Sequence, residues 1–409
     1  MNAEPLSTIV VASDGSPQYS HAIRALLGRT FRFNPSYKFI SFDQLTEADR
    51  HRLGAKGDDP EFCGVLLPSA PGLSVKAVCR NTAQLLESLR SPRSLPTDTR
   101  REFAQRGSTL VRLVLDSVLE VQLGDDFVTG AGAAKMMGLC APEQSDEGRL
   151  ARLSLQALQY GQALECGHAP ALSARLYFYN RIPASPRWTQ RIHTRRDFAD
   201  YLGLEAGGVN RQVLNHEWTL LAASPDNPDW LSWRARGKPR TPSAYKLYLS
   251  PRCEDLRETL RIVLPVLTEL DLPAFKLARD LYGILRPDKF VVYVPTLEQL
   301  AATVNALLPK LGGVRAHGIP FTAEIDAAGL MSWGMDPPRD EQLSAWQGTS
   351  WRRWVTDRLA VALLAAKELP AETELEPWQF ALQRMKIEGV DIRTWTPVNV
   401  EWAQTRDEG

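Results

Sequence analysis

The residues best suited to chemistry are lysines gathered in one segment of the chain. Only 11 residues are lysine against 37 arginines, so each lysine stands out. Four of the lysines fall within one stretch: Lys238, Lys246, Lys276 and Lys289. An overlapping stretch, residues 231–253, has no Asp or Glu and holds four arginines: Arg234, Arg236, Arg240 and Arg252. Because the whole chain has zero formal net charge, this pattern predicts a local cationic site for an anion, most naturally a phosphate.

Lysine can do chemistry that arginine cannot, because its ammonium group loses a proton more readily. Its ordinary pKa of about 10.4 falls when cationic neighbours crowd it or burial desolvates it. A lysine among arginines can therefore act as a general base while the arginines hold the anion. Lys276 is the clearest candidate, since it interrupts the apolar run 272–278 and is expected close to the core. For Lys246 and Lys289 the alternative is that they only lie on solvated strand faces or at strand ends.

Short strands and helices are expected to position these residues. Residues 244–250 alternate as a strand does, with Lys246 and Tyr248 on one face and Leu247 on the other. Thr296, followed three residues later by a glutamine, predicts the start of a helix. The order strand, helix, strand, strand, helix is typical of an α+β fold and not of a doubly wound parallel sheet. These elements are expected over residues 244–250, 254–270, 272–278, 289–294 and 297–311.

Other segments complete the expected organisation. Helical spacing predicts helices over 100–122, 150–164 and 351–369, while 172–181 is expected as an aromatic-rich strand and Pro265 to kink or end its helix. The acidic stretch 141–149 is expected to separate two regions. Residues 1–145 would form a mixed α/β region of unknown role, and 146–409 would hold the cationic segment.

Composition excludes several classes of protein. The chain has 409 residues, 44% of them hydrophobic, so it is expected to fold, and its zero net charge disfavours general nucleic-acid binding. The five cysteines include no Cys-x-x-Cys and the six histidines form no close pair, so neither a disulfide framework nor a metal site is expected. No apolar run suits a membrane span, and no basic segment precedes the apolar N-terminal stretch. We therefore expect a cytoplasmic protein without membrane partners.

Three motifs in the cationic segment, KLYLS (246–250), AFK (274–276) and RPDKFVVYV (286–294), resemble the lyase domain of class III lanthipeptide synthetases. The chain is more similar still to the HopA-type effector homologues that serve as stand-alone lyases in class V lanthipeptide and thioamitide gene clusters. The further matching segments are YFYNR (177–181), GIPFTAEIDAAGLMSWGMDPP (318–338) and WRRWVTDRLAVALLAA (351–366). The resemblance covers roughly residues 150–405 and leaves the N-terminal third unmatched.

This resemblance implies a phosphothreonine-lyase-like fold, with an antiparallel or mixed sheet flanked by helices, in residues 146–409. It also implies β-elimination of phosphate from phosphoserine or phosphothreonine, without a metal or cofactor, to give dehydroalanine or dehydrobutyrine. Lys276 would be the base that removes the α-proton, and Lys246 would stabilise the negative charge that develops. Arg286 and Lys289 would hold the phosphate, with Arg240 as a further candidate.

Tyr248 departs from the family pattern, in which a histidine at this position protonates the leaving phosphate. A tyrosine can donate a proton, and strand alternation places this one beside Lys246. The alternative is that Tyr248 only packs, and that the protein is a non-catalytic phosphopeptide-binding or scaffold protein with a lyase fold. The implied substrate is a phosphorylated ribosomal precursor peptide, and a separate kinase is expected because no segment resembles kinase loops.

Several residues are expected to be structural. Trp351 and Trp354 are spaced as one buried helix face, and Trp333 is expected to pack in the core or to line a peptide groove. His216 and His317 match no motif position and are expected to be ordinary surface or core histidines. The N-terminal third could recognise a leader peptide, dock the kinase or complete the lyase core.

Overall fold

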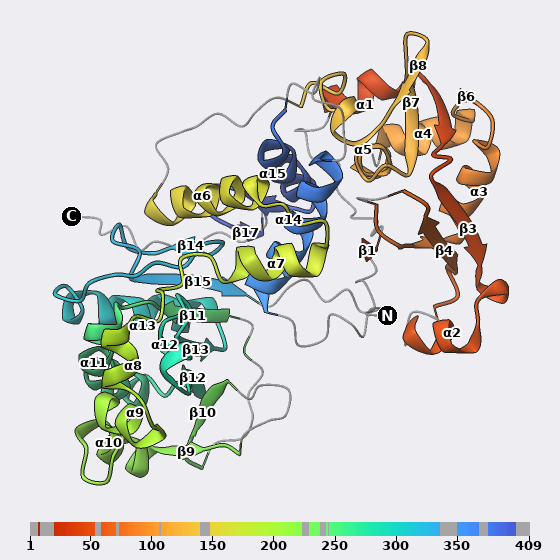
Figure 1. Cartoon of the computed structure of the whole chain (residues 1–409). Helices are drawn as coiled ribbons and strands as arrows, with labels where there is room; N and C mark the ends of the chain where they lie inside the picture. The colour runs from red at the N-terminus through yellow and green to blue at the C-terminus, as the bar shows by residue number, and fades with distance from the viewer. Residues whose placement is uncertain are drawn as a thin grey trace.

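The computed structural model shows an α+β architecture (Figure 1). One large antiparallel sheet is flanked by helices, and the N-terminal third adds a mixed α/β region with two smaller sheets. The predicted fold class is confirmed. The structure describes residues 7–8, 20–53, 59–70, 73–105, 108–139, 148–222, 229–237, 243, 245–335, 350–367 and 375–397.

Seven strands form the large sheet, and every neighbouring pair in it is antiparallel. In spatial order they are β14 (Ala323–Glu324), β15 (Met331–Met335), β11 (Tyr245–Leu249), β13 (Phe290–Val294), β12 (Ala274–Ala278), β10 (Trp230–Ala235) and β9 (Trp218–Leu220). The three strands expected from the sequence, β11, β12 and β13, are therefore present and lie together at the centre of the sheet.

One face of this sheet is apolar and covered by helices. Leu247, Val292 and Phe275 lie side by side on it, which confirms the predicted alternation along β11. Trp333 joins the same core, so core packing is confirmed for this residue. The covering helices are α8 (Pro186–Arg191), α9 (Arg195–Leu202), α10 (Val209–Glu217), α11 (Leu256–Glu269), α12 (Leu281–Ile284) and α13 (Leu297–Leu307). They leave the polar side chains of the strands to the opposite face.

Two predictions about helix boundaries, one at Thr296 and one at Pro265, had different outcomes. The Thr296 hydroxyl accepts a hydrogen bond from the backbone N–H of Gln299 at 3.2 Å and caps α13, as predicted. Pro265 does not end its helix, because α11 continues through it to Glu269.

The N-terminal third is built from short elements. Its strands are β1 (Ser7–Thr8), β2 (Thr30–Phe33), β3 (Tyr37–Ser41), β4 (Phe62–Pro68), β5 (Lys76–Cys79), β6 (Arg93–Ser94), β7 (Leu119–Leu123) and β8 (Asp126–Val128). Its α-helices are α1 (Ser20–Leu27), α2 (Glu47–Leu53), α3 (Arg80–Ser88), α4 (Thr97–Gln105) and α5 (Ser108–Leu115). The first sheet is mixed, because β1 pairs with β5 in parallel while its other pairs are antiparallel.

Two predicted elements are wrong. The segment 172–181, expected as a strand, lies mostly in helix α7 (Ala169–Tyr177), where Leu172 and Leu176 share one buried face and the aromatic residues come at the helix end. The single helix expected over 100–122 is divided into α4 and α5, and the chain then turns at Ser117, whose φ is +58°, into strand β7. Apolar residues from α5 and β7 enter the same core, so their spacing resembled one continuous helix.

One apolar core joins the N-terminal third to the C-terminal helices. It contains side chains of α1 and α5 together with α6 (Arg149–Ala163), α7, α14 (Trp351–Lys367) and α15 (Pro377–Ile387). Trp351 and Trp354 stack at 5.1 Å within it, which confirms their buried helix face. In Figure 1, α14 and α15 lie between the N-terminal elements and the large sheet. The division at residue 145 stays a prediction, and this core crosses it.

Polar contacts also join the N-terminal third to the C-terminal helices. The Arg112 guanidinium on α5 donates a hydrogen bond to the carbonyl of Ile387, and Arg384 on α15 pairs with Asp116.

Among the described helices, none combines the length and the apolar character that crossing a membrane requires.

Candidate active site

The polar face of the large sheet carries Lys246 and Lys276. Lys246 lies on β11 and Lys276 on β12, and Tyr293 on the intervening strand β13 lies between them. The Nζ atoms of both lysines lie 6.0 Å from the centre of the Tyr293 ring. Both lysines are half-buried. The structure therefore brings together the two lysines that the sequence predicted for catalysis.

Trp230 on β10 connects Lys276 to Arg286. The Nζ atom of Lys276 lies 4.1 Å from the Trp230 ring centre, and the guanidinium carbon of Arg286 lies 5.0 Å from the same centre. Both distances allow a cation–π attraction, which is stronger where water is excluded. The Trp230 side chain is almost completely buried. It holds the predicted base and the predicted phosphate-binding arginine next to one another.

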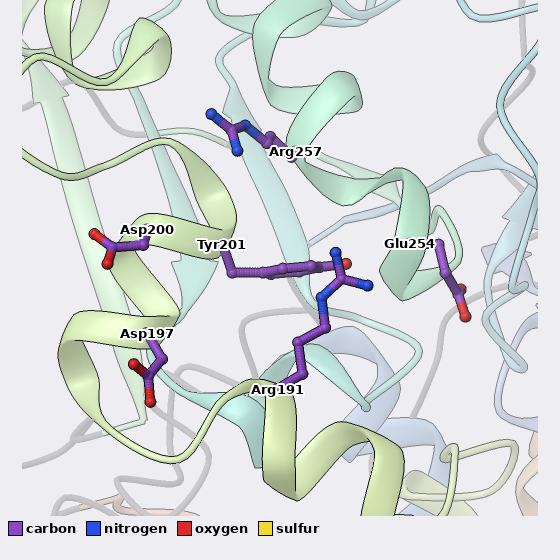
Figure 2. Close-up of a pocket in the computed structure, with 6 residues that line it drawn as sticks. All are labelled: Arg191, Asp197, Asp200, Tyr201, Glu254 and Arg257. Carbon is purple, nitrogen blue, oxygen red and sulfur yellow. The ribbon is translucent and has the colours of Figure 1, made fainter.

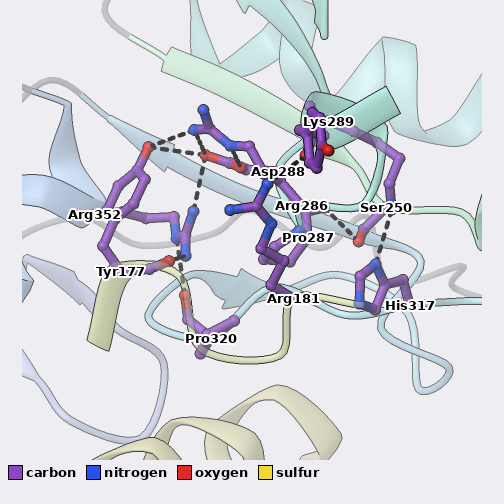
Figure 3. Close-up of polar contacts among 12 residues, drawn as sticks. Tyr177, Arg181, Ser250, Arg286, Pro287, Asp288, Lys289, His317, Pro320 and Arg352 are labelled. Carbon is purple, nitrogen blue, oxygen red and sulfur yellow. Dashed lines mark hydrogen bonds and ion pairs between the residues drawn. The ribbon is translucent and has the colours of Figure 1, made fainter. Parts of the chain in front are cut away.

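A buried ion cluster fixes the orientation of the Arg286 side chain (Figure 3). Arg286 donates two hydrogen bonds to Asp288, each 3.0 Å long, and Tyr177 donates its hydroxyl proton to the same carboxylate at 2.8 Å. Arg352 of α14 makes an ion pair with Asp288 at 3.0 Å and donates to the carbonyls of Pro320 and Tyr177. The orientation of Arg286 is thus set by Asp288 in its own turn and by two residues from distant segments, Tyr177 and Arg352.

The charges of this cluster reinforce one another. Although burial opposes the charged form of Asp288, Arg286 and Arg352 hold its pKa well below the usual range. Burial likewise opposes the charge on Arg286, yet the Asp288 carboxylate raises the pKa of that guanidinium. Burial and the same carboxylate raise the pKa of the Tyr177 hydroxyl. All three groups therefore keep one protonation state near neutral pH, and two cations share one carboxylate.

We define the cationic strip as four cations interleaved with three aromatic rings: Arg352, Tyr177, Arg286, Trp230, Lys276, Tyr293 and Lys246. Each neighbouring pair is within 6.0 Å, measured from cation to ring centre. With Asp288 as the carboxylate ion-paired within it, the strip is net positive. A dianionic phosphate and a carbonyl that gains negative charge both suit this environment.

Tyr248 lies on the same face of the sheet and next to the strip. Its ring is 3% exposed, and burial raises the pKa of its hydroxyl far above the ordinary value. Within the described part of the chain, neither this hydroxyl nor that of Ser332, its cross-strand neighbour on β15, has a hydrogen-bond partner. The Tyr248 ring lies against Gly334, where an added Cβ would be 3.3 Å away. Two buried hydroxyl groups beside the cationic strip therefore lack a hydrogen-bond partner within the described residues, which is unusual in a folded protein.

Lys289 is placed differently from the other predicted site residues. Its side chain is fully buried, and its ammonium donates hydrogen bonds to the Pro251 carbonyl and to Nδ1 of His317, each at 2.8 Å (Figure 3). Burial lowers the pKa of Lys289 to about 8. Because Nδ1 accepts, the His317 ring carries its proton on Nε2 and donates it to the Asn180 carbonyl. A phosphate-binding role for Lys289 stays a prediction, and these contacts favour a structural one.

Acidification is expected to destabilise the fold through His317. Burial and the nearby Lys289 ammonium lower the pKa of His317 from 6.5 to about 3. Between these values the unfolded chain binds a proton that the folded chain does not. Stability is therefore full above the ordinary pKa and falls with pH by about 1.4 kcal/mol per pH unit.

Urea unfolding across this pH range checks this expectation. His317→Gln should make the pH dependence shallower than in the wild type, while His51→Gln, at an exposed position of α2, should not. Equal slopes in all three proteins would show that another group titrates.

Some site residues were predicted and others were not. Arg240 lies outside the described residues. Tyr177, Trp230, Asp288, Tyr293 and Arg352 received no role from the sequence, although all except Trp230 lie inside the matched motifs. The alternation along 289–294 was the available signal for Tyr293, since it places that ring on the face opposite Val292. Among the described residues, no three His, Cys, Asp or Glu side chains are grouped as metal ligands.

Comparisons with known proteins assign no family to this chain. No protein-family model and no curated protein matches it. Among solved structures it is similar to the effector protein of Pseudomonas syringae pv. tomato strain DC3000, at 10% identity and a TM-score of 0.36. The effector protein of Pseudomonas syringae pv. syringae strain 61 is also similar, at 12% identity and a TM-score of 0.37. Both matches cover 60% of this chain and 98% of the effector.

A solved phosphothreonine lyase also matches, at 11% identity and a TM-score of 0.23, over 53% of this chain and 99% of the lyase. The relation is distant. The roles of individual residues therefore rest on the geometry of the cationic strip and on the sequence motifs.

A hollow of about 320 Å³ lies among helices over the apolar face of the sheet, away from the cationic strip (Figure 2). It mixes two arginines with three carboxylates, so it does not concentrate one sign of charge. Its lining residues are Arg191, Asp197, Asp200, Tyr201, Glu254 and Arg257.

Proposed function

We propose that the cationic strip is the active site of a metal-independent phosphoserine/phosphothreonine lyase. The observation that carries this proposal is the joint placement of Lys246, Lys276 and Arg286 on one face of the sheet, connected through Trp230 and Tyr293. The arrangement offers a base, a group that stabilises developing charge and a phosphate-binding guanidinium within one short span.

The elimination needs these groups in a defined order. Arg286 holds the phosphate, and Lys276, once it has released its own proton, takes the proton from Cα of the phosphorylated residue. The electrons of that C–H bond form the Cα=Cβ double bond, while the Cβ–O bond breaks and its electron pair leaves with the phosphate. Lys246 stabilises the negative charge that develops on the neighbouring carbonyl oxygen. The products are dehydroalanine or dehydrobutyrine and inorganic phosphate.

Arg286 has capacity for this role. Its Nε and Nη2 atoms donate to Asp288, and Nη2 also contacts the Tyr177 hydroxyl at 3.4 Å. Its Nη1 atom has no hydrogen-bond partner among the described residues, so it remains for the phosphate. The side chain is already oriented and desolvated before substrate arrives, which reduces the cost of binding.

Tyr248 is the proposed proton donor to the leaving phosphate oxygen. Tyr248→Phe is expected to slow elimination by about 100-fold, the lower range for loss of a general acid. The same change is expected to stabilise the fold by about 1 kcal/mol, because a buried hydroxyl without a partner is costly.

Single-turnover assays and urea unfolding of the same preparation measure both effects of Tyr248→Phe. A more stable variant with unchanged turnover would remove Tyr248 from the mechanism and leave its role as packing against Gly334.

A second candidate function is a non-catalytic phosphopeptide-binding or scaffold protein. The buried position and raised pKa of Tyr248 favour it, because such a phenol releases its proton reluctantly. In this case the cationic strip would hold a phosphopeptide and leave it intact.

The motif resemblance supports a biosynthetic setting for the lyase. The substrate would be a ribosomal precursor peptide that a separate kinase has phosphorylated, in lanthipeptide or thioamitide-type biosynthesis in the cytoplasm. Residues 1–145 would recognise a leader peptide or the kinase, or complete the lyase core.

Mass spectrometry of a phosphothreonine peptide, incubated with chelator-treated protein, tests the proposal. Loss of phosphoric acid from the peptide is the expected result. Release of phosphate with restoration of threonine would indicate a phosphatase and overturn the lyase. A kinase-treated cognate peptide that binds yet stays intact would support the binding protein instead.

A further inference from the structure

An exposed aromatic and cationic patch adjoins the proposed phosphate-binding arginine. It consists of Phe178, Arg181 and Tyr282, and we refer to it as the flank patch. The Phe178 and Tyr282 side chains are 37% and 56% exposed, which is unusual for rings of this size. Exposed aromatic side chains next to an arginine are enriched where proteins bind their partners.

Phe178 connects the flank patch to the cationic strip. The guanidinium carbons of Arg286 and Arg181 lie 5.2 and 5.7 Å from the centre of the same Phe178 ring. An extended peptide rises about 3.3 Å per residue, so it spans the gap between these two arginines within about three residues. Arg181 is therefore within reach of a neighbouring residue of a peptide whose phosphate binds Arg286.

The turn after α7, which carries Phe178 and Arg181 of the flank patch, is held by hydrogen bonds on both sides. The third member of the patch, Tyr282, lies on helix α12. Arg181 donates a hydrogen bond to the Tyr282 carbonyl at 3.0 Å, and the Ile182 N–H donates to the Leu285 carbonyl at 2.9 Å. On the other side, Asn180, whose φ is +66°, donates to the carbonyls of His317 and Gly318. The buried pair of Lys289 and His317 thus supports the turn through Asn180. A preformed turn binds a peptide without an ordering cost.

The exposed guanidinium of Arg181 is suited to bind a negatively charged group of a peptide. Its side chain is exposed, and among the described residues its Nε and Nη1 atoms have no hydrogen-bond partner. No ion pair joins Arg181 to a carboxylate of the described chain, so its charge remains uncompensated there. A planar guanidinium with two adjacent donors matches a carboxylate.

We propose that the flank patch is a second recognition subsite, which binds an acidic side chain of the substrate peptide within about three residues of the phosphorylated one. This inference rests on the proposed function, because it places the phosphate on Arg286. The subsite would select acidic precursor sequences and fix the register of the peptide, while the chemistry stays at Lys276.

Phosphothreonine peptides that carry Glu, Gln or Lys at each neighbouring position test the subsite. In the wild type the best Glu peptide should have a KM roughly threefold to fivefold below its Gln counterpart, as for an exposed ion pair, with kcat unchanged. Arg181→Gln should remove the preference, and Arg181→Glu should reverse it in favour of Lys. Arg175→Gln, at an exposed position of α7, is the matched control and should keep the wild-type preference.

Fluorescence anisotropy with the same peptides separates the two proposals, because it needs no turnover. A preference for Glu that depends on Arg181, without any elimination, would support the subsite and overturn the lyase. Elimination with equal KM values for the Glu, Gln and Lys peptides would support the lyase and overturn the subsite. A Glu preference that persists in Arg181→Gln would also overturn it.

Discussion

Replacing Lys276 with arginine is expected to abolish elimination while phosphopeptide binding persists. Arginine keeps the positive charge and the contact with Trp230, whose ring centre lies 4.1 Å from the lysine Nζ. It cannot give up its proton in a protein, so it cannot act as the base. We expect turnover to fall by roughly 100-fold to 10,000-fold, the range for loss of a general base.

Quenched-flow turnover and anisotropy, measured on the same phosphopeptide, check this prediction. Lys276→Ala should also lose turnover, and it should weaken binding more than Lys276→Arg because it removes a cation from the strip. Lys310→Arg is the control, since Lys310 is exposed and lies in the short 3-10 helix Leu308–Lys310 after α13. Wild-type turnover in Lys276→Arg would assign the base to another residue.

Replacing Asp288 with asparagine is expected to have the largest effect on stability. The Asp288 carboxylate is almost fully buried, forms ion pairs with Arg286 and Arg352, and accepts a hydrogen bond from the Tyr177 hydroxyl. Its removal leaves two buried guanidinium groups without their counter-charge. Loss of one partner from a buried ion pair typically lowers the free energy of unfolding by about 3–5 kcal/mol.

Urea unfolding at neutral pH measures this loss. Glu258→Gln is the matched control, because it breaks an exposed ion pair with Arg261 on α11 and should cost no more than about 1 kcal/mol. The contribution of Asp288 to stability is expected to depend on pH, and the same assay at lower pH measures that dependence. The pKa of Asp288 is depressed, so its contribution is present above the ordinary carboxyl pKa and is lost as pH falls below it. If Asp288→Asn and Glu258→Gln have equal effects, the cluster is not a stabilising unit.

The central strands could be predicted from the sequence because their signals are local. Alternation over 244–250 assigned Lys246 to the polar face, and β11, β12 and β13 follow in the predicted order. Lys276 was identified as a candidate because a lysine within an apolar run is expected close to the core, where a charged side chain is unusual. Such patterns depend only on which residues neighbour one another along one strand.

The remainder of the site could not be predicted, because it depends on long-range packing. Tyr177, Arg286 and Arg352 meet at Asp288 from α7, the turn before β13 and α14. The spacing of these residues along the chain does not predict that they meet in space. The helix α7 was mistaken for a strand because its aromatic residues favour strands, whereas burial of Leu172 and Leu176 decides its conformation.

The core shared by the N-terminal third and helices α14 and α15 has a consequence for how the molecule loses its structure. Since Arg352 of α14 also belongs to the ion cluster, the core and the proposed site are mechanically connected through one helix. We expect the whole chain to melt in one cooperative transition. A phosphopeptide bound at Arg286 would then also protect the helices α1 and α5 of the N-terminal third against proteolysis, although these helices contain no residue of the proposed site.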